Sequence, residues 1–189
     1  MGTTGSLWNI FRKDDEEHLY DDVVDKIITT MVKASKERVG VLIVIQRDMG
    51  LGEYTDTGIK IDGVVTSALL SNIFVVNTPL HDGAVIIRGN RIVSATCYLP
   101  LTASQDLSKE LGTRHRAAVG NSEVTDSYTI VVSEETGAIS LAHDRRLIRN
   151  LTVDDIKDIL LRAYAPKETE KAKIKLWKGI RANEDKSEE

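Results

Sequence analysis

The sequence lacks several features that large classes of proteins require. Cys97 is the only cysteine among 189 residues, which excludes an internal disulfide, and its place in a strand-like run predicts a small buried residue rather than a redox group. The longest unbroken apolar run, Val41 to Ile45, is far shorter than the ~20 residues of a membrane-spanning helix. There is no Walker loop, dinucleotide fingerprint, zinc-type cysteine spacing or internal repeat. The commonest nucleotide-binding folds are therefore not indicated.

Length and charge indicate one soluble globular domain. The composition is 41% hydrophobic and 29% charged with a net charge of −4, which is ordinary for a globular protein and offers no basic surface to polymeric DNA or RNA. We expect residues 1–18 to be an N-terminal arm or a cloning remnant and residues 19–165 to form the domain. Residues 166–189 are expected to be a charged, flexible tail.

The spacing of apolar residues predicts a mixed α/β fold. From Leu19 to Met31 they recur every four positions, which predicts a helix over about 20–38. The β-branched run 41–45 predicts a strand buried on both faces, and Asp62 is expected to cap a second helix. Further strands are expected over 84–88, 91–98, 128–132 and 138–142, with a tight turn at Gly89-Asn90, and further helices over 113–123 and from Thr152 to before Pro166. Together these elements predict a central twisted mixed sheet flanked by helices.

The first candidate site is His81-Asp82-Gly83-Ala84, at the entry to a predicted strand. Here a carboxylate and an imidazole adjoin a glycine, whose missing side chain lets a phosphate approach the backbone. An Asp-Gly pair also fits an ordinary turn. These residues alone leave a metal or phosphate site and a structural turn both open.

The second candidate site is Gly112-Thr113-Arg114-His115-Arg116, at a predicted helix start. It brings a hydroxyl, two guanidinium groups and an imidazole to a position where free N–H groups and the helix dipole favour anions. This set suits a polyphosphate. A solvated basic face is the alternative that the residues leave open.

Two further stretches add carboxylates and an aromatic ring. Ser133-Glu134-Glu135 places two carboxylates near a turn, where they would either hold a divalent cation or keep a hairpin tip polar. Cys97-Tyr98-Leu99-Pro100 ends a predicted strand with a ring that would either stack on a base or fill the core. Neither stretch decides between its alternatives by itself.

The stretches 78–84 and 111–118 resemble the two signature motifs of the bacterial diadenylate cyclase (DAC, or DisA_N) domain family. They read Thr-Pro-Leu-His-Asp-Gly-Ala and Leu-Gly-Thr-Arg-His-Arg-Ala-Ala, and the resemblance extends from about Tyr20 to Tyr164 with the membrane-anchored CdaA type nearest. It implies the DAC-domain fold and an enzyme that condenses two ATP molecules into cyclic di-AMP with release of two pyrophosphates. It also implies metal-assisted attack of each ribose 3′-hydroxyl on the partner α-phosphate across a facing dimer.

The resemblance implies a role for each residue that matches the family pattern. Catalytic roles fall to Asp82, Gly83, Arg114, His115 and Arg116, ATP contacts to Ala84, Tyr98, Leu99, Gly112, Thr113, Ser133 and Glu134, and metal ligation to His81, Asp82 and Glu135. Two positions depart from the pattern, because Asn121 stands where an aliphatic residue is common and Ala138 where a second glycine is common. Neither departure removes an implied ligand.

The resemblance also implies a cofactor, partners and a location. The expected cofactor is a divalent metal, Mn²⁺, Mg²⁺ or Co²⁺. The expected partners are ATP, a second copy of the chain in a homodimer or higher oligomer, a CdaR-type regulator and a phosphoglucosamine mutase. This chain is expected to be soluble on the cytoplasmic side, with the full-length protein anchored in the bacterial membrane by N-terminal helices missing here. Two alternatives are a catalytically inactive ATP- or cyclic di-AMP-binding regulatory domain and a metal-dependent phosphohydrolase.

Overall fold

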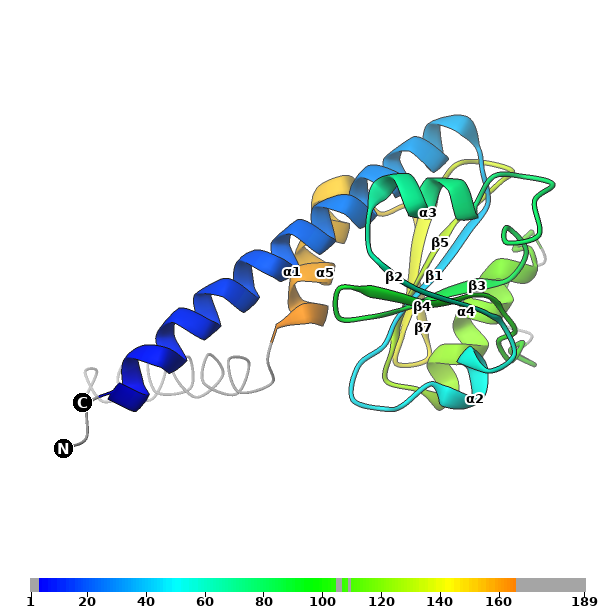
Figure 1. Ribbon diagram of the computed structural model, residues 1–189. Coiled ribbons are helices and arrows are strands. Elements are labelled where there is room, and N and C mark those ends of the chain that lie inside the picture. Colours follow the sequence, from blue (N-terminus) through cyan, green and yellow to red (C-terminus); the bar gives the residue numbers. More distant parts are fainter. Residues whose placement is uncertain (1–3, 105–106, 109, 166–189) are drawn as a thin grey trace, which may run out of the picture.

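A seven-stranded mixed sheet with helices on both faces forms the fold, shown in Figure 1 as a computed structural model. The structure describes residues 4–104, 107–108 and 110–165, so the predicted tail over 166–189 lies outside the described residues. The strands are β1 (Val41–Ile45), β2 (Ile59–Val64), β3 (Ala84–Arg88), β4 (Arg91–Cys97), β5 (Tyr128–Val132), β6 (Ile139–His143) and β7 (Arg146–Ile148). The helices are α1 (Thr4–Glu37), α2 (Gly52–Thr55), α3 (Ser67–Ile73), α4 (Thr113–Val124) and α5 (Val153–Tyr164). The predicted mixed α/β class is confirmed.

The strand order β2-β4-β3-β1-β5-β6-β7 brings several strand ends to one edge of the sheet. β1 runs parallel to β3, and the other neighbouring pairs are antiparallel. Because β4 and β5 run against β3 and β1, they end where β1, β3 and β6 begin. The loops at this edge therefore come from segments far apart in the sequence.

Both faces of the central strand β1 are buried, as its continuous apolar run predicts. Ile43 and Ile45 belong to the core that α1, α3 and α5 cover, whereas Leu42 and Val44 belong to the core beneath α4. This division follows from the two-residue period of a strand. Figure 1 shows α1, α3 and α5 together on one side of the sheet. Within the described part of the chain, no helix combines the length and the apolar character needed to cross a membrane.

The prediction that Asp62 caps the second helix is wrong. Asp62 lies in β2, with a positive φ of 48°, and its carboxylate accepts a hydrogen bond from Arg91 Nε at 2.9 Å. The cap of α3 is Thr66, whose hydroxyl accepts a hydrogen bond from the N–H of Leu69 at 3.0 Å. β2 is an edge strand with mostly exposed side chains, so no apolar alternation marks it in the sequence.

Other boundaries agree more closely with the sequence. α4 begins at Thr113 as predicted, and α5 begins with the predicted capping box of Thr152 and Asp155. The hairpin between β3 and β4 turns at Gly89, which has a φ of 57°. α1 starts at Thr4, well before the predicted start near residue 20. The exposed edge strand β7 was not predicted.

Gly120 fixes how closely α4 approaches the segment that follows β4. A Cβ atom added there would lie 2.1 Å from the carbonyl oxygen of Pro100 and 2.7 Å from the N–H nitrogen of Thr102. Four residues earlier on α4, the carbonyl of Arg116 accepts a hydrogen bond from the same Thr102 N–H at 3.1 Å. The helix and this segment therefore pack backbone against backbone, with no side chain between them.

Gly120→Ala is expected to lower the free energy of unfolding by about 1–3 kcal/mol, the usual cost of overpacking a core. The methyl group would meet backbone atoms, which cannot rotate away. Thermal unfolding monitored by circular dichroism would measure the loss. Gly52→Ala is the matched control, because a Cβ there has nothing within 4 Å. An equal melting temperature for the two variants would contradict the close approach.

Candidate active site

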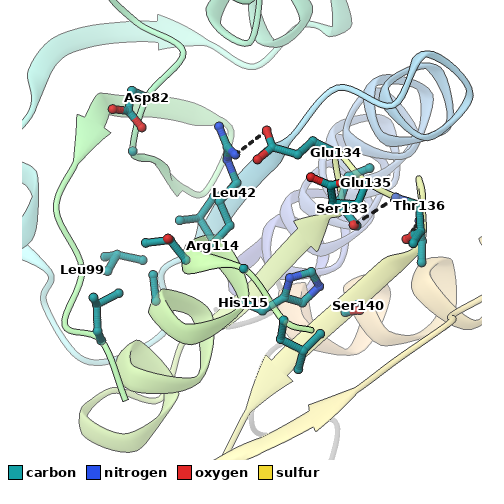
Figure 2. Close-up of a pocket in the computed structure, with 18 of the residues that line it drawn as sticks. Leu42, Asp82, Leu99, Arg114, His115, Ser133, Glu134, Glu135, Thr136 and Ser140 are labelled. Atoms are coloured by element: carbon teal, nitrogen blue, oxygen red, sulfur yellow. Dashed lines mark hydrogen bonds and ion pairs between the residues drawn. The ribbon is translucent and has the colours of Figure 1, made fainter. Parts of the chain in front are cut away.

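A cavity of about 850 Å³ lies at the sheet edge where β1, β3 and β6 begin and β4 and β5 end. The first turn of α4 forms another wall, and strands and loops from several distant parts of the sequence contribute the rest of the lining (Figure 2). The predicted site residues that line it are Asp82, Gly83, Tyr98, Leu99, Gly112, Thr113, Arg114, His115, Ser133, Glu134 and Glu135. His81, Ala84 and Arg116 lie outside this lining. The two sequence motifs thus meet in one cavity.

The tight backbone at Gly83 holds Asp82 at the rim of the cavity. Gly83 has a φ of 101°, and a Cβ there would lie 2.8 Å from the backbone of Thr96. Glycine is therefore required for the backbone to pass so close to β4. The Asp82 side chain is exposed and lies across the cavity from the Ser133–Glu135 turn (Figure 2). The sequence left a structural turn and a metal or phosphate site as alternatives for Asp82-Gly83. The structure has both a tight turn at Gly83 and an exposed Asp82 carboxylate that faces the cavity.

His81 is held beside the cavity by its own loop. Its Nδ1 lies 2.6 Å from the carbonyl oxygen of Thr78, which accepts a hydrogen bond when Nδ1 carries the proton. In that tautomer Nε2 keeps a free lone pair. Such a backbone contact is the usual way to orient a metal-binding imidazole.

Arg114 lies between Asp82 and the Ser133–Glu135 turn, as Figure 2 shows. Its Nη1 donates to Glu134 Oε2 at 2.9 Å, and its side chain is 22% exposed. The guanidinium occupies space above Gly40, where a Cβ would lie 2.7 Å from the Arg114 Cζ. The sequence does not mark Gly40 as part of the site, because its contact with Arg114 of α4 depends on tertiary structure.

His115 is buried on the α4 wall of the cavity, with 6% of its surface exposed. Burial lowers the pKa of His115, and the charge of nearby Arg149 lowers this pKa further. The imidazole is therefore neutral at neutral pH and can both donate and accept a hydrogen bond. Arg149 also lines the cavity, although neither sequence motif contains it.

The turn after β5 carries the carboxylates of Glu134 and Glu135. The N–H of Gly137 donates to the carbonyl of Ser133 at 2.8 Å, which closes the turn. Ser35 near the end of α1 donates its hydroxyl to the Gly137 carbonyl at 2.7 Å. Gly137 has a φ of 74°, and a Cβ there would lie 2.4 Å from the Ser35 carbonyl oxygen. The last turn of α1 therefore holds this wall of the cavity in place.

Tyr98 provides an exposed aromatic surface at the cavity. It is 72% exposed, so the core-filling alternative is wrong. Its N–H donates to Thr57 Oγ1 at 2.9 Å, which ties the end of β4 to the loop after α2. Leu99 and the exposed Leu101 line the same part of the cavity.

The buried thiol of Cys97 has its pKa raised to about 11 by desolvation, which agrees with the predicted inert residue.

The carboxylates suit a hard divalent metal that also binds substrate oxygens. Within the described residues, no group of three or more His, Cys, Asp and Glu side chains could hold a metal ion. Asp82 and Glu135 nevertheless both line the cavity. Mg²⁺ is usually bound by one or two carboxylates together with substrate phosphates. The donor set therefore fits a metal that arrives with a nucleotide.

The chain belongs to the family described as DisA bacterial checkpoint controller nucleotide-binding, whose model matches residues 28–147. It is 54% identical over 144 residues to the cyclic di-AMP synthase CdaA of Bacillus subtilis (strain 168), covering 74% of this chain and 53% of the relative. It is 50% identical over 169 residues to a diadenylate cyclase of Listeria monocytogenes, covering 89% of this chain and 61% of the relative. The chain thus spans just over half of each relative's length. The predicted family and CdaA type are confirmed.

Solved structures share the fold as well as the sequence. A crystal structure of a double cysteine mutant of DacA from Staphylococcus aureus matches with a TM-score of 0.76 and 42% identity, covering 82% of this chain and 99% of that one. The crystal structure of a hypothetical membrane spanning protein from Bacillus cereus matches with a TM-score of 0.66 and 44% identity, covering 68% and 63%. The predicted DAC-domain fold is therefore confirmed.

Proposed function

We propose that this chain is the catalytic domain of a diadenylate cyclase, which condenses two ATP molecules into cyclic di-AMP and two pyrophosphates. The observation that carries the proposal is the meeting of Asp82-Gly83 and the Gly112–His115 segment in one cavity. This cavity is large enough for a nucleotide and combines an apolar wall with charged groups. The names of the relatives from Bacillus subtilis and Listeria monocytogenes describe the same activity.

The proposed reaction consists of two in-line displacements. In each, a ribose 3′-oxygen bonds to an α-phosphorus, the bond to the bridging oxygen breaks, and its electron pair leaves with pyrophosphate. Asp82 takes the proton of the 3′-hydroxyl, and Arg114 stabilises negative charge on the phosphoryl oxygens. Thr113 and Ser133 contact phosphate or ribose, while Tyr98 flanks adenine. The resemblance implies His81, Asp82 and Glu135 as metal ligands, but Asp82 and Glu135 lie on opposite sides of the cavity. A divalent metal (Mn²⁺, Mg²⁺ or Co²⁺) bound to phosphate oxygens and to one of these carboxylates would add positive charge beside the phosphates.

The proposed active form is a dimer with two facing sites. Cyclic di-AMP contains two equivalent phosphodiester bonds, whereas one chain carries a single copy of each motif. A two-fold axis between two chains would bring two bound ATP molecules together so that each attacks the other. Carboxylates of the second chain or phosphate oxygens of its nucleotide would then complete the metal coordination.

Incubation of the protein with ATP and Mn²⁺, followed by mass spectrometry, tests the proposed function. A product with the mass of cyclic di-AMP, together with two pyrophosphates per product, is the expected result. ADP or AMP as the product would instead identify a phosphohydrolase. Binding of ATP without any turnover would identify the regulatory alternative. A sample without divalent metal provides the control.

Arg114→Ala is expected to weaken ATP binding and cyclisation together, each by about tenfold or more, because charge-assisted hydrogen bonds contribute about 1.5–3 kcal/mol. Calorimetric titration with ATP and a rate assay would measure the two effects. Arg162→Ala is the control, since it removes an exposed arginine of α5 outside the cavity. Unchanged ATP affinity in Arg114→Ala would contradict a phosphate-binding role for Arg114 and would favour the alternative that this stretch is a solvated basic face.

We also propose that the whole protein is held at a membrane and meets a CdaR-type regulator and a phosphoglucosamine mutase. Support comes from the resemblance to CdaA-type enzymes and from the match to the Bacillus cereus protein, which is described as membrane spanning. Residues 1–18 and 166–189 would then connect the domain of residues 19–165 to its surroundings. Fractionation of source cells and copurification of the full-length protein would test both points. Recovery of the full-length protein away from membranes would contradict the anchor.

A further inference from the structure

Arg149 brings a second arginine to the cavity from the connection between β7 and α5. Its side chain forms no ion pair or hydrogen bond with the other described residues. The charge of Arg114, by contrast, is already paired with Glu134. Among the described residues nothing pairs with the Arg149 guanidinium, so it can bind an anion without sharing its charge, whereas Arg114 would share its charge between Glu134 and a phosphate.

The sheet places Arg149 at the end of the cavity farthest from Asp82. Leu141 of β6 pairs with Ile148 of β7, so Arg149 follows directly beside Ser140. β3, which Asp82 precedes, lies four strand positions from β7 in the order β3-β1-β5-β6-β7. At about 4.8 Å per position, these strands are roughly 19 Å apart.

The direction of the reaction assigns different phosphates to these two ends. If Asp82 lies beside the 3′-hydroxyl that attacks the α-phosphorus bound in this cavity, then the α-phosphorus lies near Asp82 and the β- and γ-phosphoryl groups extend toward the opposite end of the cavity. When the bond between the α-phosphorus and the bridging oxygen breaks, its electron pair and negative charge go to the departing pyrophosphate. A guanidinium can bind that charge through two parallel hydrogen bonds.

We propose that Arg149 is a further substrate-binding residue, which holds the β- and γ-phosphoryl groups of ATP that leave as pyrophosphate. This inference rests on the proposed function and names the residue that recognises the leaving group. It accounts for an arginine that has no ion pair among the described residues and whose charge acts on the neutral imidazole of His115, which can donate one more hydrogen bond to the same phosphates. Removal of Arg149 should therefore affect ligands that carry these phosphates and spare ligands that lack them.

The test compares ligands with and without the terminal phosphates. Arg149→Ala is expected to weaken binding of 3′-deoxy-ATP, which lacks the attacking hydroxyl, by about tenfold. Affinities for AMP and cyclic di-AMP are expected to stay within about twofold, because neither contains a β-phosphoryl group. Arg146→Ala is the matched control, since it removes an exposed arginine of β7 outside the cavity. Arg149→Lys should recover part of the loss, because lysine keeps the charge without the two-pronged geometry.

The calorimetric outcomes separate this inference from the proposed function. Unchanged affinity of Arg149→Ala for 3′-deoxy-ATP would overturn the inference. An equal loss for AMP and cyclic di-AMP would also overturn it, because the residue would then support the cavity as a whole. If the wild-type chain binds 3′-deoxy-ATP in this selective way but forms no cyclic product, the proposed function fails while the role of Arg149 stands.

Discussion

Asp82→Asn is expected to abolish nearly all formation of cyclic di-AMP while ATP affinity stays within about tenfold. The change removes the charge that binds metal and accepts the 3′-hydroxyl proton, yet it keeps the shape of the side chain. Because Asp82 is exposed at the cavity rim, folding should be unaffected. Product formation under saturating ATP and calorimetric titration would measure the two quantities separately.

The control for Asp82→Asn is the same substitution at a carboxylate outside the cavity. Asp144→Asn removes an exposed carboxylate from the turn between β6 and β7 and should leave both product formation and ATP affinity unchanged. The melting temperatures of both variants should equal that of the wild-type chain. Near-normal product formation by Asp82→Asn would remove Asp82 from the proposed mechanism.

Specific activity is expected to rise with protein concentration until the chains are fully dimeric and then to level off. Each chain can bind ATP, but one chain cannot complete both phosphodiester bonds, so activity follows the fraction of paired chains. Chains in solution must find their partners by diffusion, so their effective concentration is the concentration of protein in the sample. A dilution series with sedimentation measurements at the same concentrations would show whether activity follows assembly.

Mixed dimers provide a second measurement of the same assembly. An excess of Asp82→Asn chains should suppress product formation by wild-type chains, because most wild-type chains would then face a partner without its carboxylate. An excess of Asp144→Asn chains should not suppress it. Constant specific activity in a sample shown to be monomeric would rule out the facing arrangement.

The elements that the sequence revealed are those with a local signal. The run 41–45 is apolar because both its faces are buried, and the capping box at Thr152 lies within four residues. The edge strands β2 and β7 were not predicted, because their side chains are largely exposed. An exposed strand needs no apolar alternation, so only its pairing partners reveal it.

The candidate site was predictable to the extent that its residues lie in short motifs. The contributions of Gly40 and Arg149 depend on which segments the sheet brings together, and no local pattern marks them.

The environment of Asn121 also could not be predicted from local sequence. Its Nδ2 donates to Ser127 Oγ at 2.7 Å and to Thr129 Oγ1 at 2.9 Å. The side chain is thus fully buried among polar partners from outside its own helix, which the sequence of α4 alone does not reveal.

The contact between Ser35 and Gly137 restricts where the chain can change in length. Surface turns usually tolerate insertions, and the turn after β5 has the polar residues typical of such positions. Here the turn must reach the last turn of α1 at a glycine with no room for a side chain. An insertion between Ser133 and Gly137 would need a matching shift of α1. Length variants among natural sequences should therefore concentrate in other loops and be rare in this turn.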